Sequence, residues 1–320
     1  MKYNNWHIST LLVGVLLFAG CNSEGDLVDV GDRIAVQFTT SLGGTQTRIA
    51  SSGNASTWVA GDRVGIFMVT HGGSLAADIA ESADNMQYTA STAAAASGLA
   101  PVAAPTDQTI FYPPYGSAVD FIACYPYKAT GTGAGQINDY KYPVDVSNQA
   151  DPAAIDLLYA KANNSGSGYT ATDNAVVSLP FAHLLSRISL TLTPGTGMTA
   201  ADLAGATVKV TNLSTQALCD LNNGSLGSKT APATVIFKTA TDGRSSSAIV
   251  IPQTTPGTSK LTVTLTDGSS KEASFASITW EAGYTYPYTI QVSKAGSSGI
   301  TLGNWQSDGT THTGTIYIPW

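Results

Sequence analysis

Residues 176–194 read VVSLPFAHLLSRISLTLTP, and in the second half of this stretch Ile188, Leu190 and Leu192 alternate with polar residues. Strict alternation of apolar and polar residues is typical of a β-strand that buries one face. Similar short strands follow at intervals of roughly 10 to 20 residues, separated by turns rich in Gly, Asn, Asp and Ser. They lie at residues 208–210, 235–237, 249–252, 261–265, 277–280 and 286–292. This pattern predicts an all-β fold of the sandwich type.

The sequence before residue 176 also contains strands, but longer loops rich in Gly, Ala and Ser separate them. These β-prone segments lie at residues 33–42, 58–69, 119–127 and 155–160. The spacing of the strands changes near Pro180. We therefore expect an N-terminal β-sandwich domain at residues 49–180 and a C-terminal β-sandwich domain at residues 181–320.

An alternating strand stands near each end of the chain. The first reads RIAVQFTTSL at residues 33–42, and its expected apolar face consists of Ile34, Val36, Phe38 and Leu42. The polar stretch TQTRIASSGNAS follows, in which Arg48 is the only basic residue before Trp58. That stretch has no apolar alternation and few β-forming residues, so a protease could extend it at Arg48–Ile49. A solvated loop arginine without a role is the alternative.

The second terminal strand is TIYIPW, the last six residues, which follows a turn-rich segment at residues 303–314. In an extended chain Ile316, Ile318 and Trp320 share one face. The chain is therefore expected to carry an apolar strand close to each end.

The N-terminal stretch LLVGVLLFAGC at residues 11–21 is apolar and too short to span a bilayer as a permanent helix. Its length suits the apolar core of a secretory signal, and the small residues Ala19 and Gly20 stand directly before Cys21. This order resembles a bacterial lipobox, although Phe18 stands where Leu is usual. We expect residues 1–20 to be the signal peptide and Cys21 to be lipidated, with residues 21–48 forming a lipidated N-terminal segment. An ordinary signal and a short buried helix are the alternatives.

The composition is acidic and poor in charge: 15 Lys and Arg stand against 22 Asp and Glu, and charged residues make up 12% of the chain. Nucleic acid binding requires clustered Lys and Arg, so the composition argues against it. Glu24 and Asp26, just after Cys21, resemble the acidic residues of lipoproteins displayed on the outer surface, so an exported, surface-exposed outer-membrane lipoprotein is the expected localisation.

Two cysteines remain beyond the signal segment. Cys124 and Cys219 each lie in an apolar, strand-like setting, 95 positions apart and on opposite sides of the expected domain boundary. Export permits a disulfide. Their settings favour two separate buried thiols over a bridge.

The chain shows no signature of catalysis. Outside the signal its histidines are His71, His183 and His312, none with the spacing of a metal site. His183 is expected to be packed in a core. No nucleophile elbow or phosphate-binding glycine loop is present. A pair of catalytic carboxylates of the glycosidase type stays open as an alternative, because the two residues of such a pair are close in the folded protein and need not be close in sequence. We expect no enzyme, no metal and no cofactor.

Several motifs together resemble the fimbrillin family of type V pilus subunits. They occur in order along the chain, at Arg48, Trp58 to Phe67, Ile110 to Tyr127, Asp156 to Ala160, Leu179 to Ile188 and the IPQT at residues 251–254. Each motif is short, and the ordered set makes the resemblance specific. The departures are Phe111, the doubled Pro113-Pro114, and Cys124 in place of a frequent aromatic residue.

The resemblance implies two tandem transthyretin-like β-sandwich domains in a stalk, tip or anchor subunit of a surface fimbria. It also implies export as a lipoprotein, held in the outer membrane through Cys21. A surface Arg-specific protease would then cut between Arg48 and Ile49 and remove the first strand. A strand from another fimbrial subunit would fill the groove, and the C-terminal strand with Ile316, Ile318 and Trp320 would serve as donor. Whether the polymer contains one kind of subunit or several stays open.

The alternative is a monomeric, surface-exposed glycan-binding lipoprotein whose two terminal strands are ordinary edge strands. Trp58, Trp280 and Trp305 would then form an aromatic platform for sugar. An exposed aromatic cluster on one face would favour this alternative, and an apolar groove vacated by residues 33–42 would favour polymerisation.

Overall fold

The computed structural model describes residues 33–42, 57–173, 176–274 and 277–293, together with the backbone of residues 312–317. In these ranges the chain is built mainly of strands in three sheets, which confirms the expected all-β class. The helical segments are short: α1 (Pro152–Ile155), η1 (Pro114–Gly116), η2 (Asn164–Gly166), η3 (Ala171–Asp173) and η4 (Ala200–Leu203). No helix in the described part of the chain has the length and apolar character needed to cross a membrane.

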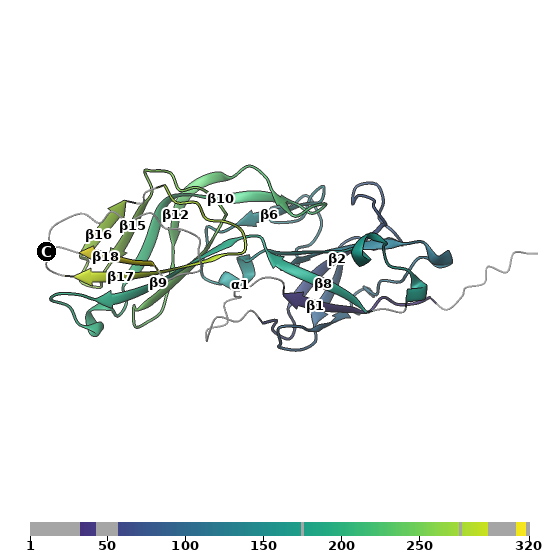
Figure 1. Ribbon diagram of the computed structural model, residues 1–320, viewed down its shortest axis with the longest axis horizontal. Helices are drawn as coiled ribbons and strands as arrows, with labels where there is room; N and C mark the ends of the chain where they lie inside the picture. The colour runs from purple at the N-terminus through teal and green to yellow at the C-terminus, as the bar shows by residue number, and fades with distance from the viewer. Residues whose placement is uncertain (1–32, 43–56, 174–175, 275–276, 294–311, 318–320) are drawn as a thin grey trace, which may run out of the picture. The chain divides into compact units, whose positions relative to one another are not determined.

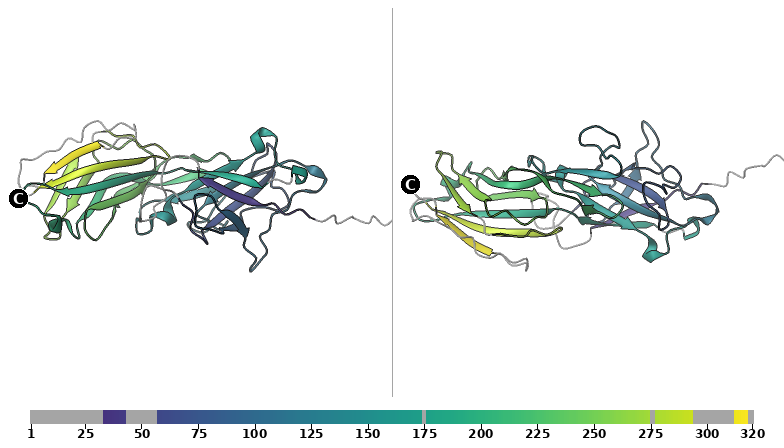
Figure 2. Two further views of the ribbon diagram at one scale, coloured as in Figure 1. Left: turned by 60° about the horizontal axis from the view of Figure 1, so that its bottom comes forward. Right: turned by 90° about the horizontal axis from the view of Figure 1, so that it is seen from above.

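The first sheet closes on itself in the order β1-β4-β3-β2-β5-β7-β8. Its strands are β1 (Phe38–Leu42), β2 (Arg63–Thr70), β3 (Met86–Ala90), β4 (Gly98–Pro101), β5 (Val119–Tyr125), β7 (Leu158–Ala162) and β8 (Val177–His183). Every neighbouring pair is antiparallel except β1 and β8, which run parallel. β1 therefore joins two strands that would otherwise be sheet edges (Figures 1 and 2).

Two further sheets hold the rest of the strands. The six-stranded sheet contains β6 (Lys141–Asp145), β10 (Thr207–Asp220), β11 (Ser225–Leu226), β12 (Thr230–Ile236), β15 (Lys260–Thr264) and β16 (Ser270–Ser274). The five-stranded sheet has the order β13 (Lys238–Thr239), β14 (Ser245–Val250), β9 (Ser186–Pro194), β17 (Thr285–Ser293) and β18 (His312–Tyr317). The long strand β10 pairs with four other strands and organises its sheet.

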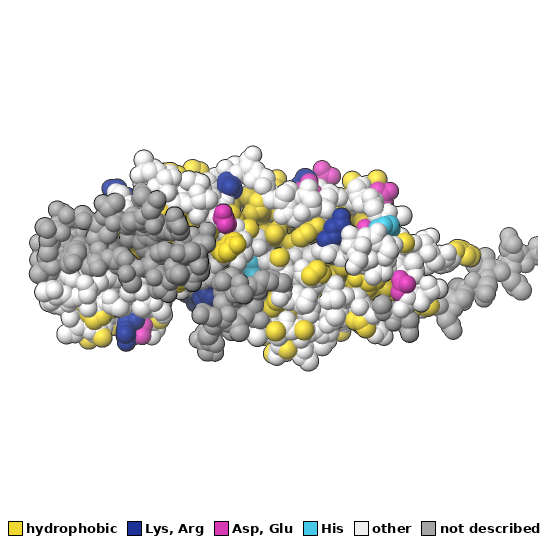
Figure 3. All heavy atoms as spheres, in the orientation of Figure 1, with side chains coloured by type: hydrophobic (Ala, Val, Ile, Leu, Met, Phe, Trp, Pro, Cys, Tyr) yellow, Lys and Arg dark blue, Asp and Glu magenta, His cyan; other side chains and the backbone are white. Residues whose placement is uncertain are grey.

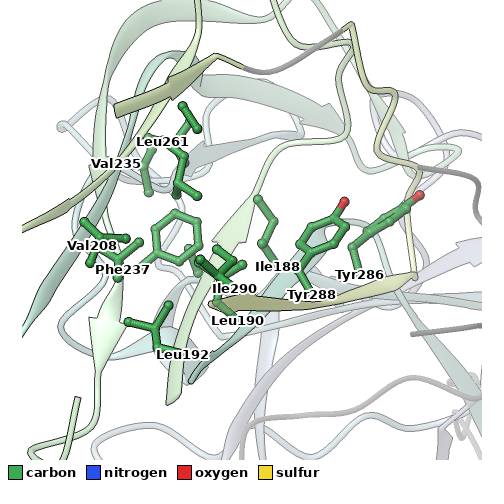
Figure 4. Packing of buried hydrophobic residues seen from close by; sticks show 14 of the residues in the cluster. Ile188, Leu190, Leu192, Val208, Val235, Phe237, Leu261, Tyr286, Tyr288 and Ile290 are labelled. Atoms are coloured by element: carbon green, nitrogen blue, oxygen red, sulfur yellow. The ribbon is translucent and has the colours of Figure 1, made fainter. Parts of the chain in front are cut away.

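These two sheets share a hydrophobic core. The alternating row Ile188, Leu190 and Leu192 of β9 is buried, as the sequence pattern predicted. Figure 4 shows this row beside Tyr288 and Ile290 of β17, with side chains of the facing sheet, such as Val208, Val235 and Leu261, completing the cluster. The period of two in the sequence thus places one face of β9 in this core.

A second core fills the closed sheet, and a third lies where strands from both halves of the chain meet. The second draws on residues from Val36 to Phe181. The third joins residues such as Phe67 and Ile122 to Ile249 and Ile251. β6 precedes residue 180 but pairs with β10, with Tyr142 opposite Cys219. Position 180 itself lies inside β8. Contacts therefore join residues on both sides of position 180, the domain boundary expected from the sequence.

Both cysteines of the described region lie in this third core. Cys124 and Cys219 are fully buried and unbridged, in agreement with the expectation of two buried thiols. Burial raises the pKa of each thiol to about 12. At neutral pH both are therefore protonated core residues with low nucleophilicity.

Candidate functional site

The candidate site is the position between β4 and β8 that β1 occupies. We call this position, with the residues that line it, the seat of β1. Phe38 lies opposite Leu99 of β4 and, on the other side, opposite Val177 of β8. The pairing with β8 continues to Leu42, which lies opposite Phe181. Both edges of β1 are thus used in backbone pairing, as they are in a central strand. Removing β1 would leave β4 and β8 as unpaired edges, which are templates for another strand.

The chain just before β1 is held by the segment at residues 110–112. Val36 donates its backbone N–H to the carbonyl of Ile110 over 2.9 Å, and Tyr112 donates to the carbonyl of Ile34 over 3.0 Å. This contact gives a structural reason for part of the motif at residues 110–127, which begins IFYPPYG. The segment extends the seat of the first strand beyond β4.

The inward face of the first strand fills the closed sheet. Val36 is 5% exposed and Phe38 is 3% exposed, and the Phe38 ring packs edge-on against Tyr88 with 5.2 Å between the centroids. Leu42 is partly buried and packs against the same core. Burial of side chains of this size contributes about 1.5–3 kcal/mol each. Hydrophobic packing therefore holds β1 in addition to its backbone pairing.

Ile34 departs from the face that alternation assigned to it. It is 46% exposed, whereas Val36 two residues later is buried. The pairing of β1 with β8 starts only at Phe38, opposite Val177, so Ile34 lies four residues before the first β8 partner. The buried face is correspondingly shorter at its N-terminal end than the sequence predicted.

Thr40 is a buried member of this face that the apolar pattern did not reveal. It is 1% exposed, and its neighbour Ser97 is 2% exposed. The Thr40 N–H donates to the Ser97 carbonyl over 2.8 Å, and the Thr40 hydroxyl oxygen accepts the Ser97 N–H over 3.0 Å. The only indication of this burial in the sequence is that Thr40 falls at an inward position of the segment FTTSL. Apolar alternation does not mark this position, because Thr is a polar residue.

The lining of the seat is neutral around Phe38. Tyr88 accepts the backbone N–H of Ile110 over 2.8 Å. Burial raises the pKa of Tyr88 to about 12, and it also raises the pKa of Tyr112 to about 12. Both phenols therefore stay uncharged at neutral pH. This part of the seat suits an apolar strand with few polar side chains.

The motif at residues 58–67 supports the same core. Trp58 is fully buried and packs edge-on against Tyr125 and Phe181, at centroid distances of 5.4 and 5.1 Å. Asp62 accepts the N–H of Val59 over 2.7 Å and the hydroxyl of Tyr125 over 3.1 Å. The Gly61 that precedes it has a φ of +89°, which favours glycine. These motif residues are explained by packing and turn geometry.

A second group of motif residues meets at the junction between β8 and β9. His183 Nδ1 lies 2.9 Å from Asp156 Oδ2, with the two side chains 8% and 5% exposed. His183 is packed in the interior, as predicted, but the sequence did not reveal its partner 27 positions away. Burial lowers the pKa of the nearby Arg187, and Asp156 opposes that shift. Residues of the motif at 156–160 (DLLYA) and of the HLLSR segment at 183–187 therefore form one buried polar cluster.

The IPQT motif has a similar explanation. The Gln253 carboxamide accepts the N–H of Ser214 over 3.0 Å and donates to the carbonyl of Ser214 over 3.1 Å. Ser214 follows an irregularity in the pairing of β10 between Val210 and Leu213. The buried side chain thus replaces a strand partner at this point.

The C-terminal strand β18 pairs in parallel with β17, with Ile316 opposite Val292. It stands last in the order of its sheet, next to β17 in Figure 2. Ile318 and Trp320 lie outside the described residues, as do Cys21, Arg48 and Ile49.

The tryptophans suggested for sugar binding are buried where the structure describes them. Trp58 and Trp280, two members of the suggested sugar platform, are 0% and 1% exposed, and Trp305 lies outside the described residues. Among the described residues no group of three His, Cys, Asp or Glu is placed to hold a metal ion. On the face that Figure 3 shows, charged side chains are few and scattered.

The fold and the seat of β1 together describe an all-β protein whose first strand completes a closed sheet. The chain belongs to the fimbrillin-like family: residues 47–308 match the family described as Fimbrillin-like. This confirms the resemblance that the motifs indicated. Proteins of this family are structural fimbrial and cell-adhesion proteins and not enzymes.

Individual relatives agree with this assignment. The chain is 31% identical over 297 residues, 89% of each chain, to a Bacteroides uniformis protein named "Putative fimbrium subunit Fim1C". A crystal structure of a "putative cell adhesion protein" from Bacteroides uniformis is 30% identical, with a TM-score of 0.66 over 83% of this chain and 94% of that one. A second crystal structure, from Bacteroides ovatus, is 20% identical with a TM-score of 0.61 over 81% and 92%, and it shares the fold.

Proposed function

We propose that this fimbrial subunit polymerises by exchanging its first strand. A protease would cut between Arg48 and Ile49, β1 would leave, and a strand from a neighbouring subunit would take its place. The observation that carries the proposal is the position of β1, which is inserted between β4 and β8 and fills the core with Phe38. When a peptide binds by adding a strand to a sheet edge, it uses the same two interactions, backbone pairing and side-chain pockets.

The energetics favour replacement of β1 over its simple loss. Without a strand in this position the seat would expose Tyr88 and Phe121 as well as two sheet edges. Exposed apolar surface and unpaired backbone groups both cost free energy. An incoming strand restores the pairing on both sides and buries the apolar lining again. In a linear polymer each subunit then completes the next.

The remaining parts of the proposal concern the ends and the organisation of the chain. A signal peptide at residues 1–20 and lipid on Cys21 would deliver the precursor to the outer membrane as a surface-exposed lipoprotein. The C-terminal strand with Ile316, Ile318 and Trp320 would enter the groove of another fimbrial subunit. The body would consist of two tandem transthyretin-like sandwiches, at residues 49–180 and 181–320. The cluster around Ile188 contains only residues after position 180, which supports this division, whereas the third core includes residues from both sides of it.

The test is the substitution Arg48→Ala in cells that make the fimbria, with Arg33→Ala as the matched control. Arg33 precedes the first strand, so cleavage there would leave β1 in place. We expect Arg48→Ala to stay at precursor size and to be absent from the surface polymer, and Arg33→Ala to be processed normally. Wild-type polymer from Arg48→Ala would refute the cleavage site.

A further inference from the structure

The pair formed by Thr40 and Ser97 places a polar requirement in a seat that is otherwise apolar. Both residues are almost fully buried. In the antiparallel pairing of β1 with β4, Phe38 lies opposite Leu99 and Thr39 lies opposite Gly98. One position further, the backbone N–H of Thr40 still reaches the Ser97 carbonyl, at 2.8 Å. The Ser97 N–H is met by a side chain, the Thr40 hydroxyl, at 3.0 Å.

Ser97 is fixed in this position from its other side. Its hydroxyl oxygen accepts the N–H of Thr92 over 3.0 Å, and the hydroxyl donates to the carbonyl of Gly98 over 3.0 Å. The Ser97 side chain is therefore engaged within its own loop. A strand that replaces β1 with an apolar residue at the Thr40 position would bury the Ser97 N–H without this acceptor. A buried backbone donor without a partner is unfavourable.

The chain's own C-terminal strand does not offer the matching pattern. The inward face of β1 and of the residues just before it reads Val36, Phe38, Thr40 and Leu42, with a hydroxyl two residues after an aromatic ring. The apolar face of the C-terminal strand reads Ile316, Ile318 and Trp320 and carries no hydroxyl. A second copy that presented this face would therefore leave the Ser97 N–H without the acceptor that Thr40 supplies.

We propose that the Thr40 position, read by Ser97, selects the incoming strand: the groove takes an extended strand of a different subunit that carries Ser or Thr two residues after a bulky aromatic residue. This rests on the strand exchange proposed above. A hydroxyl at this position is worth about tenfold in affinity, the usual effect of leaving one buried donor unpaired. The C-terminal strand of this chain enters the groove of another kind of subunit.

The experiment uses the unprocessed chain of residues 21–320 with a site for a sequence-specific protease inserted between Arg48 and Ile49. After cleavage the segment with β1 stays bound without a covalent link, and labelled peptides compete with it. The probes are the peptide of residues 31–44, its Thr40→Ser and Thr40→Val variants, its Phe38→Ala variant, and the peptide of residues 311–320. Their dissociation constants are measured by competition.

We expect the wild-type and Thr40→Ser peptides to bind alike, and Thr40→Val to bind about tenfold more weakly although its shape is nearly the same. The 311–320 peptide should also bind more weakly than the wild type. Equal binding of Thr40→Val and wild type, with weak binding of Phe38→Ala, would overturn the role of Thr40 and leave strand exchange standing. If no peptide displaces the cleaved segment, strand exchange itself fails, and the inference fails with it.

Discussion

The ring of Phe38 meets the ring of Phe121 edge-on, with 5.1 Å between their centroids and an interplanar angle of 84°. Phe38 belongs to β1 and Phe121 to β5, and the two strands are not neighbours in the closed sheet. The contact therefore crosses the interior of the sheet. It makes the first strand part of the core, even though the proposed assembly requires this strand to leave.

Phe38→Ala is expected to destabilise the unprocessed protein by about 3–5 kcal/mol, since it removes an aromatic side chain from a packed core. Ile34→Ala is the matched control on the same strand segment. Ile34 is 46% exposed, so its loss should cost less than about 1 kcal/mol. Urea denaturation of both variants gives the comparison. Equal losses for the two would mean that the Phe38 side chain is not held in the core.

Asp156→Ala is expected to cost about 3 kcal/mol, because it leaves His183 buried without its acceptor. The control is Glu272→Ala, which breaks an ion pair of similar length with Lys260, 2.9 Å in both cases. Those two side chains are about half exposed, so their pair should contribute less than about 1 kcal/mol. Thermal unfolding distinguishes the two variants. Similar small losses would show that the buried pair does not stabilise the junction of β8 and β9.

Stability should fall as the pH rises from 10 to 12. Burial raises the pKa of Tyr88 and Tyr112 to about 12, from the ordinary value of 10.0. Their contribution is fully present below pH 10 and is lost as the pH approaches 12, since the unfolded chain releases these protons first.

Tyr112→Phe should make this decline shallower and leave stability at pH 7 nearly unchanged, because the buried Tyr112 hydroxyl has no hydrogen-bond partner. Tyr115→Phe is the control, since that ring is 98% exposed and should not change the profile. Denaturation midpoints between pH 7 and 12 test this. The prediction is wrong if Tyr112→Phe keeps the wild-type slope.

Deleting residues 315–320 should stop polymer growth and lower the melting temperature of the precursor by less than about 5 °C. The deletion removes the end of β18, which stands last in its sheet, and all three apolar residues of the proposed donor face. The measurements are thermal unfolding of the truncated precursor and the ladder of surface polymer. A large fall in melting temperature with an unaltered ladder would favour an ordinary edge strand.

The sequence was most informative where one strand's own pattern determines burial. The rows at Ile188 and at Phe38 were predicted because alternation assigns side chains to faces without knowledge of the partner strand. Ile34 was assigned wrongly because alternation within one strand does not show where its buried face ends, which depends on the neighbouring strands. The start of a neighbouring strand is a property of the sheet and not of the strand itself.

Pairs of distant residues were not predictable in this way. Asp156 and His183 stand in separate motifs, and the Thr40–Ser97 pair joins residues 57 positions apart. The pairing of β6 with β10 across position 180 likewise needs the fold. The spacing of polar residues in the sequence does not identify their contact partners, so these contacts became known only from the structure.

Strand exchange requires β1 to leave the subunit when the polymer forms. N-terminal sequencing of the protein recovered from purified surface fimbriae tests it most directly. We expect the polymerised subunit to begin at Ile49 and to lack residues 33–42. A polymerised subunit that begins at Cys21 and still carries residues 33–42 would contradict it.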